Sequence, residues 1–117
     1  MTEYSPHEHF LYAGLIRLHV LHHAAHAPIY GLEMIEQLAR LGHRLSAGTI
    51  YPILHTMEER GLLSVTEKSF GRTRRRFYRA TPAGLKALAA ARLRVRELFA
   101  DLIEDVPVRR TARPGPA

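Results

Sequence analysis

The chain has 117 residues, 46% of them hydrophobic and 24% charged, which is the size and composition of one domain with its own core. Because it contains no cysteine, disulfides, thiolate metal sites and cysteine nucleophiles are excluded. The sequence has no apolar run near the roughly 20 residues of a membrane-spanning helix and no signal-peptide pattern, so we expect a cytoplasmic protein. It also lacks paired carboxylates in a plausible cleft, a nucleophile elbow and a phosphate-binding glycine loop, so we expect neither an enzyme nor a cofactor.

The positive charge of the chain is concentrated in arginine clusters. The net charge is +6 with a pI near 10.3, and the clusters lie at 72–79 and 92–96. A clustered basic surface predicts an acidic partner, with nucleic acid first and an anionic membrane second. The simpler alternative is that the charge only keeps the protein in solution.

The first predicted helix covers 8–25 and should end before Pro28, because proline disfavours helical backbone at the residue before it. It carries an apolar stripe at helical spacing, made of Leu11, Gly14, Leu15, Leu18, Leu21 and Ala25. Only Glu8 and Arg17 are charged, so this helix is too apolar to stand free.

Four histidines lie near the end of this helix: His19, His22, His23 and His26. They form two i, i+4 pairs, a spacing at which two imidazoles can bind one divalent metal ion. No carboxylate or cysteine lies nearby in the sequence to complete such a site, so we expect no metal. The alternatives are packing at a helix–helix contact and a pH-sensitive interface. The alternative function that these histidines leave open is a metal- or pH-responsive regulator.

The second predicted helix covers 29–41, with Gly31, Met34, Ile35 and Leu38 inward and Gly42 as its C-terminal stop. After a short link, 46–61 predicts a third helix whose buried residues are Ile50, Ile53, Leu54 and Met57. Its outward face carries small, aromatic and hydrogen-bonding groups: Gly48, Pro52, His55 and Glu59, flanked by Tyr51 and Thr56. Two short helices, the second with a face reserved for a partner, predict a helix-turn-helix.

Pro52 affects where the third helix begins. If Ser46 were the N-cap, Pro52 would fall in the second turn and remove a hydrogen bond to Gly48. If Thr49 is the N-cap, Pro52 lies in the first turn, where its missing N–H has no cost. We therefore predict a start near Thr49 or an irregular first turn over 46–49.

Two strands are predicted after this helix, at 62–66 and 74–80, with a turn at 69–72 and with Phe77 and Tyr78 on opposite faces. The turn and the second strand carry five arginines: Arg72, Arg74, Arg75, Arg76 and Arg79. A basic hairpin beside a helix with a reserved face predicts a winged helix-turn-helix, with the helix in the major groove of DNA and the wing on the backbone or minor groove. The alternative is an edge strand protected from aggregation by its charge.

The last predicted helix begins at the cap Thr81-Pro82 and runs to about Asp105, roughly 36 Å at 1.5 Å per residue. Its apolar residues follow a heptad-like spacing at Leu88, Ala91, Val95, Leu98 and Leu102, widened by Leu85, Phe99 and Ile103. We predict a dimerisation helix, and the alternative is a helix that folds back on its own core. The basic tail, 106–117, is expected to be disordered.

The segments IRLHVLHHAAHAPIYGLEMIEQL, LSAGTIYPILHTMEERGLL and GRTRRRFYRATPAGLKAL closely resemble the PadR family of bacterial transcriptional regulators, over about 15–88. The resemblance implies a homodimeric winged-helix repressor that binds a palindromic operator. The single C-terminal helix is similar to that of the short subgroup. Family members respond to phenolic acids, drugs or other small molecules, so the resemblance leaves room for an effector without identifying one.

The expected fold is mainly α (α+β): one domain with a winged helix-turn-helix core at 8–80 and a dimerisation helix at 81–105. The residues expected to contact double-stranded DNA are Tyr30, Ser46, Gly48, Thr49, Tyr51, Pro52, His55, Arg72, Thr73, Arg74, Arg75 and Arg76. Of these, the arginines, Thr49 and Tyr51 are assigned to phosphates and His55 to base edges. The residues expected in the dimer interface are Leu11, Leu15, Leu18, Leu88, Val95, Leu98, Phe99 and Leu102.

Overall fold

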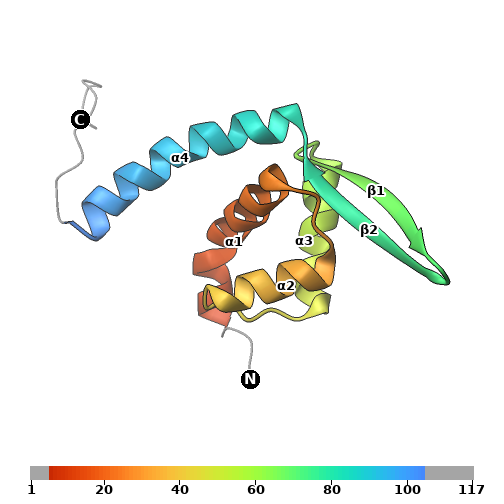
Figure 1. The fold of residues 1–117 in the computed structure, drawn as a ribbon. Helices are drawn as coiled ribbons and strands as arrows, with labels where there is room; N and C mark the ends of the chain where they lie inside the picture. Colours follow the sequence, from red (N-terminus) through yellow and green to blue (C-terminus); the bar gives the residue numbers. More distant parts are fainter. Residues whose placement is uncertain (1–5, 105–117) are drawn as a thin grey trace.

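The computed structural model describes residues 6–104, and Figure 1 shows their arrangement. The elements in chain order are α1 (Pro6–His26), α2 (Gly31–Arg40), α3 (Ala47–Glu59), β1 (Leu63–Phe70), β2 (Thr73–Ala80) and α4 (Pro82–Leu102). Helices α1 to α3 form the body, the hairpin projects from one side, and α4 crosses past α1 and extends beyond the body. This is a winged helix-turn-helix followed by a long C-terminal helix, which confirms the predicted fold class. The predicted end at Asp105 and the tail lie outside the described residues.

The core lies where the three helices of the body meet the inner end of the hairpin. Its fully buried side chains come from every element of that body: Ile16, Val20, Met34, Leu38, Ile50, Leu54, Met57 and Leu63. Most residues of the apolar stripe predicted for the first helix do not face the core. Leu11 is 69% exposed and Leu15 is also exposed, whereas Ile16, Val20, Leu21 and Ala24 enter the core. A helix with apolar residues on two sides does not reveal by periodicity which side faces its own core.

The second helix begins two residues later than predicted, because Ile29 pairs with the hairpin. The Ile29 N–H donates to the Tyr78 carbonyl at 2.9 Å, and the Tyr78 N–H donates to the Ile29 carbonyl at 2.8 Å. This isolated bridge places a third extended segment beside β2 and buries the Ile29 side chain. Pro28 disfavours helical backbone at the residue before it, Ala27. The open edge of β2 then supplies hydrogen-bond partners for the backbone of Ile29.

Of the two alternatives predicted for the third helix, the start near Thr49 is wrong. Ser46 occupies the N-cap position, α3 begins at Ala47, and Pro52 lies inside the helix. The Ser46 carbonyl accepts hydrogen bonds from the N–H groups of Thr49 and Ile50, at 3.1 and 3.0 Å. Pro52 cannot bond the Gly48 carbonyl, but Gly48 is exposed and water can reach that carbonyl. Burial of Ile50, Leu54 and Met57 holds the helix in place despite the lost hydrogen bond.

The hairpin is longer than predicted, because its strands continue to a two-residue turn. They are antiparallel and pair Leu63 with Ala80 at the inner end and Phe70 with Thr73 at the tip. Gly71 in the turn has a φ of 63°, a left-handed conformation that glycine adopts without steric cost. Tyr78 is buried and Phe77 is only half-buried, so the predicted opposition of these two residues is confirmed.

Helix α4 begins as predicted, with Thr81 as its N-cap. The Gly84 N–H donates to Thr81 Oγ1 at 2.9 Å, and the same hydroxyl donates to the Gly61 carbonyl. This hydroxyl therefore joins the start of α4 to the end of the helix-turn-helix. Leu88 is buried, whereas the large apolar residues farther along α4 are exposed. None of the helices in residues 6–104 combines the length and apolar character needed to cross a membrane.

Candidate DNA-binding surface

The outer face of α3 has the exposure expected of a recognition helix. Gly48, Tyr51, Pro52 and His55 are exposed, and Thr49 is half-buried. The helix contains no lysine or arginine, and its only formal charges are the carboxylates of Glu58 and Glu59. Positive charge for binding DNA phosphates must therefore come from other elements.

Tyr51 is held against α2 by a close approach of the two helices. A β-carbon added to Gly31 would lie 2.5 Å from both Cζ and Oη of Tyr51, so the ring occupies the space beside the glycine. Gly31 itself is buried. The absence of a side chain at the first residue of α2 thus sets the position of an aromatic residue on the face of α3.

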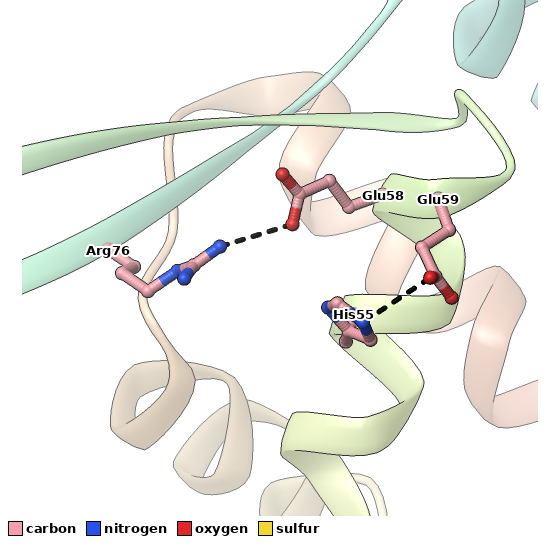
Figure 2. Close-up of polar contacts among 4 residues, drawn as sticks. All are labelled: His55, Glu58, Glu59 and Arg76. Atoms are coloured by element: carbon pink, nitrogen blue, oxygen red, sulfur yellow. Dashed lines mark hydrogen bonds and ion pairs between the residues drawn. The ribbon is translucent and has the colours of Figure 1, made fainter.

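Both carboxylates of α3 lie beside basic side chains, as Figure 2 shows. Arg76 of β2 donates from Nη2 to Oε1 of Glu58 at 3.1 Å, and Nε2 of His55 lies 3.5 Å from Oε2 of Glu59. The first contact joins the hairpin to α3, whereas the second lies within one turn of α3. Arg76 therefore reduces the negative charge that Glu58 would otherwise present on this side of α3.

The arginines of the hairpin are not equivalent. The guanidinium of Arg75 lies 4.4 Å from the centre of the Tyr30 ring, and that ring makes an edge contact with Phe77 at 5.5 Å. Arg74 is well exposed, and its Nη1 lies 4.0 Å from Glu67. Arg72 and Thr73 are exposed at the tip. Arg72 and Arg74 are thus the arginines best placed to reach DNA phosphates, and Tyr30 supports the wing from the body.

Two arginines that the sequence did not single out also lie beside α3. Arg17 and Arg60 line a concavity of about 400 Å³ together with Pro52, Thr56 and Met57. Arg60 follows the last residue of α3, which is a local signal that could have identified it. Arg17 is on α1, and only the fold brings it to this flank.

The four histidines of α1 do not converge on one point. The rings of His22 and His26 are 4.5 Å apart, but His19 approaches His43, at 5.1 Å, rather than its i+4 partner. Among residues 6–104 no group of three histidine, aspartate or glutamate side chains is arranged to hold a metal ion. Burial lowers the pKa of His19, His22 and His23, and neighbouring positive charges lower these pKa values further.

An apolar groove of about 430 Å³ lies on the other side of the body, between α1 and α4. Leu15 and Leu18 line it from α1, and Leu88, Val95 and Phe99 line it from α4. All five are residues that the heptad-like and helical spacings assigned to a dimer interface. In the single chain this groove is open to solvent, apart from the buried Leu88 at its inner end.

Comparison with known proteins agrees with this geometry. Residues 20–90 match the transcriptional regulator PadR-like family. A transcriptional regulator of Mycobacterium tuberculosis is 43% identical over 88 residues, covering 75% of this chain and 82% of the relative.

Solved structures show the same arrangement of elements. A PadR family transcriptional regulator from Eggerthella lenta is 28% identical, with a TM-score of 0.71 over 81% of this chain and 83% of that one. A PadR-like regulator from Bacillus cereus, at 24% identity, shares the fold with a TM-score of 0.73 over 80% of this chain and 93% of that one. The chain belongs to the PadR-like family of transcriptional regulators, which are DNA-binding proteins and not enzymes.

Proposed function

We propose that the protein is a homodimeric repressor that binds a palindromic operator. Helix α3 would enter the major groove, and the wing at 69–76 would contact the adjacent backbone or minor groove. The observation that carries this proposal is the division of the surface into two kinds. One side presents the outer face of α3, which has no lysine or arginine of its own, beside exposed arginines, and the other presents a long apolar face on α4.

The apolar face of α4 supports a second copy of this chain as its partner. Val95, Leu98, Phe99 and Leu102 are between 43% and 68% exposed, although the helix-turn-helix already has a complete core. The exposed Leu11 and Leu15 of α1 continue the same kind of surface. A single domain gains nothing from these side chains in water, whereas two copies packed along α4 and α1 would bury them.

A dimer also suits the charge of the protein. Two copies carry a net charge of +12 (twice +6), which favours binding to a polyanion. Two-fold symmetry in the protein requires a palindromic site, with half-sites about 34 Å, one duplex turn, apart. An effector would release the operator by shifting the population between dimer geometries, because α4 would set the spacing of the two α3 helices.

The test is binding to labelled DNA from the protein's own promoter, measured by fluorescence anisotropy at several salt concentrations. We expect a dimer on each palindrome, an affinity that falls steeply as salt rises, and weaker binding when one half-site is scrambled. A reporter gene behind the same promoter should be less active when the protein is present. Binding that does not change with salt, or equal binding to intact and scrambled sites, would contradict the proposal.

A further inference from the structure

We propose that Arg76 positions the wing by pairing with Glu58 and does not serve as a phosphate contact. This inference rests on the proposed DNA-binding surface, and it changes the role that the sequence suggested for Arg76. Glu58 becomes part of the binding machinery although its charge has the same sign as DNA. The pair would set the angle between the hairpin and α3.

The argument begins with where the hairpin leaves the core. Tyr78 is buried and bridged to Ile29, whereas residues 66–70 and 71–76 are all exposed. Tyr78 lies five residue steps along β2 from Thr73, so the free part of β2 is roughly 17 Å long at about 3.3 Å per residue. A 10° swing about Tyr78 would then move the tip by about 3 Å on that length. Such a shift is enough to separate a side chain from a phosphate oxygen.

Arg76 is placed to prevent this swing. Side chains alternate along a strand, so Arg76 lies on the same face of β2 as Tyr78, two residues farther out. Its guanidinium lies 5.8 Å from the Tyr78 ring and donates to Glu58 at 3.1 Å. Figure 2 shows this side chain reaching from β2 toward α3, where Glu58 points back at it.

The side chain of Glu58 is less exposed than those of the other charged pair on the hairpin, Arg74 and Glu67. The side chains of Glu58 and Arg76 are 29% and 48% exposed, whereas those of Arg74 and Glu67 are 75% and 50% exposed. Because Glu58 is partly buried, its pairing with Arg76 is screened less by water and salt than the exposed pair of Arg74 and Glu67. Arg75 contacts Tyr30 from the opposite face of β2, so the free part of the strand is held on both sides.

The variant Glu58→Gln distinguishes two possible roles of Glu58, because they predict opposite changes in operator affinity. Removing a carboxylate beside DNA should strengthen binding if Glu58 only repels phosphates. If Glu58 holds the wing through Arg76, the same change should weaken operator binding, and we expect a loss of about tenfold, since a misplaced wing loses one or two phosphate contacts. The matched control is Glu67→Gln, which removes an exposed carboxylate from the hairpin itself and should strengthen binding or leave it unchanged.

A charge exchange completes the test. Arg76→Glu and Glu58→Arg should each weaken operator binding at least tenfold, and the double variant should recover to within about threefold of the original affinity, because the pair is restored in reverse. The salt slope of the double variant should equal that of the original protein. A double variant that stays as weak as Arg76→Glu, with a slope reduced by about one, would show that Arg76 binds a phosphate and would overturn the proposal.

Arg72→Ala, measured alongside, separates this inference from the proposed function. If Arg72→Ala lowers the salt slope while Glu58→Gln tightens binding, the wing binds DNA and only the positioning role of Arg76 is wrong. If none of these variants changes operator binding, the wing is not part of the DNA-binding surface. Thermal unfolding of each variant checks that the fold is kept.

Discussion

The ring of Tyr51 on α3 fills the space that a β-carbon on Gly31 of α2 would need. This contact joins the two helices of the helix-turn-helix at the residue that we assign to a phosphate. It makes the position of Tyr51 depend on a glycine at residue 31, where any side chain would push the ring outward.

Gly31→Ala should therefore weaken operator binding, by roughly tenfold, and lower the free energy of unfolding by about 1–3 kcal/mol, because the added methyl group overpacks the contact. Fluorescence anisotropy and thermal unfolding measure the two effects. Adding Tyr51→Ala should restore stability but not DNA binding. Unchanged binding by Gly31→Ala would show that Tyr51 is not needed.

The exposed arginines of the wing give a prediction about ionic strength. Arg72→Ala and Arg74→Ala should each weaken binding to every DNA sequence and reduce the slope of log affinity against log salt by about one. Arg94→Ala is the matched control, because Arg94 is an exposed arginine on α4 that pairs with Glu97. Equal slopes for all three variants would exclude the tip of the wing from the DNA contact.

The local signals of the sequence predicted several of these features. The i, i+3, i+4 spacing of Ile50 and Leu54 separated the buried side of α3 from its exposed side, and Thr81-Pro82 marked the start of α4. These predictions hold because each depends on residues within one turn of helix. The alternation of Phe77 and Tyr78 is similarly local, since successive side chains of a strand face opposite ways.

Features that depend on distant partners could not be predicted in this way. Ile29 is not part of the second helix, because its backbone forms two hydrogen bonds with Tyr78 at the edge of β2. The pairing of Arg76 with Glu58 joins residues 18 positions apart, and no spacing rule relates them. The start of α3 was misjudged because a local penalty at Pro52 was outweighed by burial of the following turns. In each of these cases a tertiary contact overrides a local conformational preference or joins residues that no local rule relates.

The proposed dimer predicts a specific effect of substitutions on α4. Leu98→Glu should yield monomers in sedimentation equilibrium, because a carboxylate would replace an apolar side chain in the contact at a cost of several kcal/mol, roughly a hundredfold or more in the dimer dissociation constant. Leu93→Glu is the control, because Leu93 is exposed on the opposite side of the same helix and should leave the mass unchanged. Monomers from both variants, or from neither, would contradict the assigned face.

Acid should destabilise the fold through His43. This side chain is only 6% exposed, between α2 and α3, and its ring lies 5.1 Å from that of His19 and 6.2 Å from that of Tyr12. Burial lowers the pKa of His43 from its ordinary value of 6.5. Burial is also the main cause that lowers the pKa of His19, and the nearby histidines His43, His23 and His22 lower it further. Both histidines then bind protons more readily in the unfolded chain than in the folded one.

The free energy of unfolding should therefore be constant above the unfolded pKa of about 6.5 and fall as the pH drops below it. Urea unfolding at a series of pH values between 5 and 8 measures this dependence. His43→Phe should make this dependence shallower, whatever its effect on stability at pH 8, because one buried ring no longer titrates. The lowered pKa values of His19, His22 and His23 account for the dependence that remains. An equal slope in His43→Phe and the original protein would assign the acid sensitivity to other groups.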